Sequence, residues 1–197
     1  MHRYDEFPAR QRLLGGLALL LLLLACGKDP SPVAAAATTR CVTGGRLATE
    51  IYGGIRASLD WQSGDLHCEG MPRPNGAGAR LRFSGPASPA EAGRHLAFIF
   101  GLPDLQRGQT GDEMPTNVTV IEEDAGRFFS SRDTTTCWTD IDRQDNVQAG
   151  GDDASSDDYL ISGVLYCVAP LAELHGNASL RIADLRFVGR LNWRVPQ

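Results

Sequence analysis

The sequence predicts an all-β domain, an antiparallel β-sandwich of the jelly-roll kind with one short helix. Apolar and polar residues alternate along several short segments, which is the pattern of a strand with one buried face. Gly, Pro, Asn and Asp cluster between these segments at intervals of about 8–12 residues, as in sandwiches and barrels. We expect about nine strands on this pattern, and an up-and-down barrel is the alternative.

The N-terminus is a leader built around one apolar run. Arg3, Arg10 and Arg12 precede Leu13–Leu24, which is almost wholly leucine with small residues between. As a helix this run rises about 18 Å, whereas a bilayer core needs about 20 residues to span it. The run therefore has the length of a signal helix and is too short for a transmembrane span.

The leader ends in the motif Leu-Leu-Ala-Cys, whose cysteine is Cys26. This motif resembles the lipobox of bacterial lipoproteins, in which a lipid is added to the cysteine sulfur and the leader is cut before it. The resemblance implies a signal peptide over residues 1–25 and a lipid anchor at Cys26. Gly27 in the next position favours the outer membrane, at its periplasmic face. The alternative is an ordinary signal peptide with a chance cysteine.

Residues 26–39 read as the lipidated cysteine and a flexible tether, because they hold two prolines and a run of small residues but no apolar face. The remaining residues, 40–197, are enough for one domain with a sizeable core. The whole chain has a formal net charge of −5, and the leader contributes more cations than acids. The mature chain is therefore acidic, and we expect no nucleic-acid partner.

Four further cysteines predict two disulfides, since an even number in an exported chain is typical of disulfide bonding. We favour Cys41–Cys68 and Cys137–Cys167, because each pair joins neighbouring strand candidates. The alternative is a zinc site, but only His67 lies near these cysteines and the spacing does not match paired zinc ligands.

Apolar alternation is clearest at residues 55–61, 80–83, 95–100 and 117–120. Residues 118–122 and 127–131 read as a hairpin, with Gly126 available for a positive φ in the loop. The short helix is predicted to start at Ser88, with Pro89 in its first position and Glu91 completing a capping box.

Residues 159–168 are apolar at both odd and even positions, which predicts a central strand covered on both faces. Farther on, the apolar positions change phase: Leu180 and Ile182 are even-numbered, whereas Leu185 and Phe187 are odd-numbered. A β-bulge near residues 183–184 would produce this slip, and a tight turn between two strands is the alternative.

An acidic loop is the first candidate for a binding site, with four carboxylates between residues 150 and 158. Loops rich in Asp and Ser can wrap Ca²⁺, so calcium is the cofactor this loop would take. The spacing matches no EF-hand, and the alternative is a solvated loop that binds nothing. The four residues are Asp152, Asp153, Asp157 and Asp158.

Two further surface features are candidates for ligand contact. Arg186, Arg190 and Arg194 share one face of the last strand and could meet anionic lipid or glycan, pair with the acidic loop, or protect an edge strand. Trp138 is out of phase with its apolar neighbours and is expected at the surface, where it could stack on a sugar. Trp61 and Trp193 continue inward alternations, so we expect them in the core.

Catalytic motifs are sparse, since the chain lacks a G-x-S-x-G elbow, an H-E-x-x-H helix and an S-x-x-K pair. The segment that ends in Cys167 is similar to strands of uncharacterised exported β-sandwich lipoproteins, a resemblance that implies no activity. We therefore expect a non-catalytic module that binds an envelope protein or a glycan. The alternatives are a structural subunit of an envelope complex and a small glycan hydrolase, with its acids among Glu122, Glu123, Asp140 and Asp142.

Overall fold

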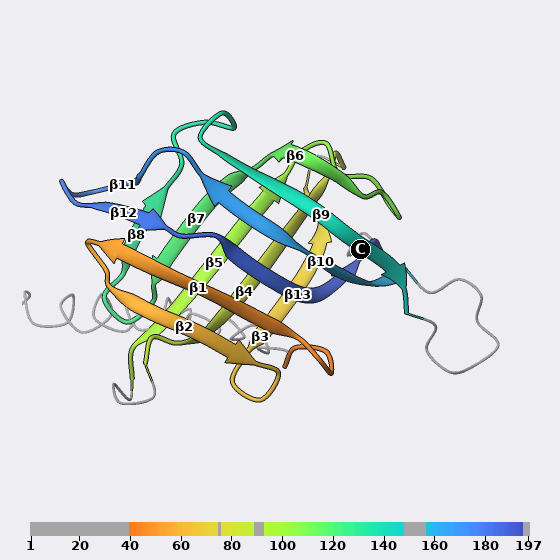
Figure 1. Cartoon of the computed structure of the whole chain (residues 1–197), viewed down its shortest axis with the longest axis horizontal. Coiled ribbons are helices and arrows are strands. Elements are labelled where there is room, and N and C mark those ends of the chain that lie inside the picture. The colour runs from red at the N-terminus through yellow and green to blue at the C-terminus, as the bar shows by residue number, and fades with distance from the viewer. Residues whose placement is uncertain (1–39, 75, 89–92, 148–156, 195–197) are drawn as a thin grey trace, which may run out of the picture. The chain divides into compact units, whose positions relative to one another are not determined.

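The structure is a computed structural model that describes residues 40–74, 76–88, 93–147 and 157–194 (Figure 1). The predicted leader, lipobox and tether, and most of the predicted short helix, lie outside these residues. The described residues all belong to one compact unit, residues 38–197. They form strands and turns without a helix, so none of their segments is a membrane-spanning helix.

The described residues form thirteen strands, more than the nine expected. Among the strands that the alternation did not predict, Gly111–Pro115 and Leu171–Glu173 have only five and three residues, too few for alternation to be recognised. In chain order the strands are β1 (Arg46–Gly53), β2 (Ala57–Gln62), β3 (His67–Pro72), β4 (Ala79–Pro86), β5 (His95–Leu102), β6 (Gly111–Pro115), β7 (Asn117–Glu122), β8 (Arg127–Ser130), β9 (Cys137–Asn146), β10 (Asp158–Cys167), β11 (Leu171–Glu173), β12 (Ser179–Ile182) and β13 (Leu185–Asn192).

Every pairing between these strands is antiparallel, so the predicted all-β antiparallel class is confirmed. The strands make one hydrogen-bonded path in the order β3-β4-β5-β7-β8-β11-β12-β1-β13-β10-β9-β6, with β2 beside β1. In Figure 1, β1, β13, β10 and β9 lie in front of β3, β4, β5 and β7. The path therefore doubles back on itself and encloses the core.

The core is held by aromatic side chains that meet across the folded path. Phe83 of β4 contacts Phe187 of β13, with ring centroids 5.4 Å apart, and Phe100 of β5 lies within 5.6 Å of both. Gly189 permits this approach, because a Cβ there would lie 2.6 Å from the ring of Phe83. Trp61 is 4% exposed and meets Phe98 edge to face, as its inward alternation predicted.

Both predicted disulfides are confirmed. Cys41 is bonded to Cys68 and Cys137 to Cys167, with Cα atoms 4.6 and 4.1 Å apart. Cys137 and Cys167 lie directly opposite each other on β9 and β10, so this disulfide fixes the register of the two strands. The pairing also removes the zinc alternative, since all four sulfurs are in disulfides.

The predicted phase slip in the last segment is a β-bulge. On one side of it Ile51 of β1 pairs with Ile182, and on the other side Ala48 pairs with Arg186. Two residues of β1 thus face three residues between β12 and β13, which is one extra residue on the second strand. The bulge turns the odd-numbered residues of β13 inward, so Leu185 and Phe187 are buried.

Strand β10 has two neighbours, β9 and β13, as expected of a central strand. Its inward residues Ile161 and Leu165 are fully buried. The outward residues Val164 and Tyr166 are only half-buried, so the second face is not covered as the sequence suggested. This outward face of β10 carries part of the candidate site.

Candidate functional site

The centre of the candidate site is a stacked aromatic pair on the outer face of β9 and β10. Trp138 and Tyr166 lie directly opposite each other, one residue along from Cys137 and Cys167. Their ring centroids are 6.2 Å apart with an interplanar angle of 26°. Both side chains are half-buried, because alternation sends the neighbouring Cys137 and Leu165 into the core. The pair is therefore partly accessible to solvent on the outer face of the two strands.

Carboxylates border this aromatic pair. Asp140 lies two residues from Trp138 on the same face of β9, and its Oδ1 accepts a hydrogen bond of 2.7 Å from the backbone N–H of Glu113. Glu113 has a φ of 52°, which is uncommon for a residue other than glycine, and lies in an irregularity of the edge strand β6. Pro115 of the same strand pairs with Trp138. The edge strand thus brings a second acid beside the aromatic surface.

The negative charges of these acids affect the pKa of Tyr166. The pKa of its phenol is raised, first by burial and then by the negative charges of Asp140, Glu113 and Asp112. Tyr166 therefore stays protonated and keeps its hydroxyl as a hydrogen-bond donor. The face combines aromatic carbon, carboxylate acceptors and one phenolic donor, which are the groups that contact a polyhydroxylated ligand.

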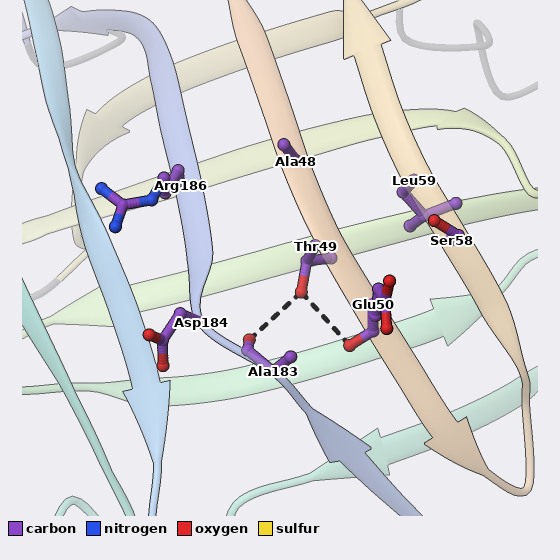
Figure 2. Close-up of a pocket in the computed structure, with 8 residues that line it drawn as sticks. All are labelled: Ala48, Thr49, Glu50, Ser58, Leu59, Ala183, Asp184 and Arg186. Carbon is purple, nitrogen blue, oxygen red and sulfur yellow. Dashed lines mark hydrogen bonds between the residues drawn. The ribbon is translucent and has the colours of Figure 1, made fainter.

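A shallow depression lies over β1, β2 and the start of β13 (Figure 2). Arg186 pairs in register with Val164 of β10, which in turn pairs with Asp140 of β9. In Figure 2 the Arg186 side chain points away from Glu50 of β1, on the side of β13 where β10 lies. The lining residues are Ala48, Thr49, Glu50, Ser58, Leu59, Ala183, Asp184 and Arg186.

The arginines of the last strand divide into two groups. Arg190 donates to Asp158 at 3.0 Å, and Arg194 lies 3.5 Å from Asp157. These two ion pairs agree with the predicted alternative in which the arginines of the last strand pair with the acidic loop. Arg186 has no ion pair with any described residue, and its side chain is exposed. Only Arg186 of the stripe therefore remains available at the candidate site.

The acidic loop does not present its carboxylates as a calcium cage in the part that the structure describes. Asp157 is shared between Arg107, at 2.8 Å, and Arg194. Asp158 also accepts from the side-chain amide of Asn192 at 2.6 Å. No group of three or more His, Cys, Asp or Glu among the described residues is placed to hold a metal. Asp152 and Asp153 lie outside the described residues.

The tryptophan at the end of the chain has a structural contact. Trp193 is partly buried against the core and donates from Nε1 to the side-chain oxygen of Gln144 at 2.7 Å. Gln144 also donates to the carbonyls of Gln106 and Gln109, at 3.0 and 2.8 Å. These contacts bind the loop before β6 to β9, and they leave Trp138 as the tryptophan of the outer face.

The four acids proposed for a hydrolase do not meet in one site. Glu122 is 6% exposed and forms ion pairs with Arg94, at 2.8 Å, and Arg127, at 3.3 Å. It ends β7, and about 17 Å of strand separates it from the start of β7, next to which Thr116 donates its backbone N–H to the carbonyl of Cys137 in β9. Glu123 follows it in the same hairpin. Glu122 is therefore engaged in ion pairs within the fold. Asp140 and Asp142 lie on a different strand, β9.

Sequence reasoning found Trp138 and Asp140 but missed Tyr166 and Glu113 as members of the site. A signal for Tyr166 was present, because two cysteines opposite each other on antiparallel strands place the adjacent residues opposite as well. Glu113 had no such signal, since the pairing of β6 with β9 is not encoded in any local pattern.

The outer face can hold a ligand by stacking and hydrogen bonding, and it shows no activated nucleophile among the described residues. Trp138 and Tyr166 supply the flat apolar surface, while Asp140, Glu113 and Arg186 supply polar groups around it. Comparison of the chain with protein-family models, with curated proteins and with solved structures gave no significant match.

Proposed function

We propose that the chain is a lipid-anchored envelope protein whose folded domain binds a glycan without catalysis. The observation that carries the proposal is the stacked pair of Trp138 and Tyr166, half-buried and bordered by Asp140 and Glu113. In this proposal the folded-over sheet acts as a β-sandwich that presents its outer face. Contacts such as Phe83 with Phe187, between strands far apart in the path, support that description.

The membrane part of the proposal rests on the N-terminal motif. The apolar run that ends at Cys26 resembles a lipoprotein leader, and acyl chains contribute about 0.8 kcal/mol for each buried CH₂. Several chains on one cysteine would make the attachment effectively permanent. Residues 27–39 would then hold the domain near the periplasmic face of the outer membrane, where envelope glycans are within reach.

The glycan part of the proposal rests on chemical fit. A pyranose ring presents C–H groups on its faces and hydroxyl groups around its rim. The rings of Trp138 and Tyr166 can pack against the apolar face, as aromatic groups do in ligand sites. The rim hydroxyls can donate to Asp140 and accept from the phenol of Tyr166. A neutral or weakly basic sugar suits this acidic border better than an anionic one.

Binding of soluble peptidoglycan fragments and neutral oligosaccharides, measured by isothermal titration calorimetry, tests the proposal. Trp138→Ala should lower the affinity about tenfold, because it removes the larger of the two rings. Phe128→Ala is the matched control, since Phe128 is an exposed aromatic on β8, on another part of the surface. Absence of binding to every oligosaccharide, or equal losses in both variants, would overturn the proposal.

A further inference from the structure

A second surface feature adjoins the aromatic pair where β12 separates from β10. Beyond the bulge, β12 pairs with β1 and β11 and runs away from β10 (Figure 1). The separation leaves a slot of about 220 Å³ between the end of β10 and β12. Most of its lining is apolar, and the lining residues are Tyr52, Cys167, Ala169, Arg181, Ile182 and Ala183.

The slot and the depression share one lining residue. Ala183, the first residue of the bulge, lines both of them. Cys167, at the other wall of the slot, follows Tyr166 in β10 and packs against the core, on the opposite face of the strand from Tyr166. Tyr166, Arg186 and Tyr52 lie on the outward faces of β10, β13 and β1, which are neighbouring strands in the sheet.

Of these three residues, Tyr52 is the farthest from β10 in strand order. It lies on the outward face of β1, is 43% exposed, and pairs in register with Arg181 of β12. Its hydroxyl donates a hydrogen bond to the carboxylate of Glu50, which fixes the direction of the ring. Tyr52 is thus an exposed aromatic ring with a cation, Arg181, and a carboxylate, Glu50, beside it.

The spacing of the two aromatic positions exceeds the width of one sugar ring. Tyr166 is on β10 and Tyr52 on β1, with β13 or β12 between them, so they are separated by at least two strand spacings, about 10 Å. A monosaccharide on the Trp138–Tyr166 pair would not reach Tyr52, whereas a linear oligosaccharide would cross the depression and touch both.

We propose that Tyr52 is a second aromatic subsite, and that the ligand is an extended oligosaccharide lying from the Trp138–Tyr166 pair across the bulge to the slot. This inference rests on the proposed glycan binding. It adds that the ligand is longer than one sugar and that Tyr52 contacts only the longer ligands. Arg181 then donates to hydroxyl or acetamido oxygens of the distal sugar, and the slot receives an apolar edge of that sugar.

The test is a length series with the mature lipoprotein in detergent micelles. Affinities for β-1,4-linked N-acetylglucosamine oligomers and for glucose oligomers, from the disaccharide to the hexasaccharide, are measured by isothermal titration calorimetry. In the better-binding series, we expect the hexasaccharide to bind about tenfold more tightly than the disaccharide. Tyr52→Ala should remove this gain and leave the disaccharide unchanged, while Tyr52→Phe should retain it because the ring remains.

The outcomes separate the inference from the function on which it depends. Equal affinity for short and long oligomers, or a loss on Tyr52→Ala that is the same at every length, overturns the second subsite and leaves glycan binding standing. If the wild-type protein binds no member of either series, both proposals fall. Thermal unfolding of Tyr52→Ala and Tyr52→Phe, compared with the wild type, shows whether an affinity loss reflects a lost ring or a disturbed strand.

Discussion

The hydroxyl of Thr49 donates a hydrogen bond of 3.1 Å to the carbonyl of Ala183, at the bulge that separates β12 from β13 (Figure 2). The same hydroxyl lies 3.3 Å from the carbonyl of Glu50. Thr49 points inward and is only 7% exposed, so it is a polar residue in an otherwise apolar row. The extra residue of the bulge removes the carbonyl of Ala183 from the regular ladder, and the buried hydroxyl supplies a partner for it.

The first prediction concerns this hydrogen bond. Thr49→Val keeps the shape of the side chain but removes the hydroxyl that bonds to the carbonyl of Ala183, so it should lower the free energy of unfolding by about 0.5–1.5 kcal/mol. Urea unfolding followed by tryptophan fluorescence measures the change. Ser58→Ala, at an exposed position on the neighbouring strand β2, should alter stability by less than about 0.5 kcal/mol. A Thr49→Val variant as stable as the Ser58→Ala variant would contradict this account of the bulge.

The second prediction distinguishes the two disulfides. Replacing Cys137 and Cys167 together by alanine should cost about 3–4 kcal/mol of stability, on the chain-entropy model for a loop of this length. It should also weaken glycan binding, because this disulfide fixes the register that brings Trp138 beside Tyr166.

The other disulfide provides the control for that prediction. The variant in which alanine replaces both Cys41 and Cys68 opens a loop of similar length, with a sequence separation of 27 against 30. It should lose a similar amount of stability and retain the affinity of the outer face. Unfolding curves and calorimetric affinities of both variants, compared with the wild type, give the result; equal affinities in the two variants would argue against a role for register.

The third prediction is a pH dependence of stability that involves Glu173. Its carboxylate accepts hydrogen bonds from Arg127 at 2.8 Å and from the N–H of Ala178 at 3.1 Å, and these contacts lower its pKa below the ordinary 4.5. A carboxyl with a lower pKa in the folded state stabilises the protein fully above the unfolded pKa. That contribution is lost as the pH falls through the folded-state pKa.

Urea unfolding between pH 7 and pH 3 measures this dependence. The free energy of unfolding of the wild-type protein should fall below about pH 4.5, and Glu173→Gln should show a shallower fall because it removes one of the carboxyls that must be protonated. The variant should also be less stable at pH 7, where the ion pair with Arg127 is lost. Identical pH profiles for the two proteins would exclude a contribution from Glu173.

The fourth prediction tests the anchor. Cys26→Ser removes the sulfur that the lipobox resemblance assigns to the lipid, so the protein made in its native cell should move from the detergent phase to the aqueous phase of a detergent split. Replacing Lys28 by serine, two residues away, should leave the partition unchanged. If Cys26→Ser partitions as the wild type does, the lipid anchor is wrong and the envelope location loses its support.

The sequence by itself determined the local features of this protein. The alternation at 95–100 and 117–120 predicted strands that form as β5 and β7, and the loop at Gly126 predicted the hairpin of β7 with β8. Cysteine spacing predicted both disulfides. The phase slip predicted the bulge near Ala183, because one extra residue reverses the face of every residue that follows.

Only the tertiary structure decided which of these elements meet. Alternation shows which face of a strand is buried but not which strand lies beside it, because partner choice depends on packing between segments far apart in the chain. Thus Glu122 is ion-paired in the β7–β8 hairpin while Asp140 borders the aromatic pair, although sequence reasoning had grouped them. Likewise Arg190 and Arg186 share one strand face, yet the folded position of Asp158 neutralises the first and leaves the second exposed.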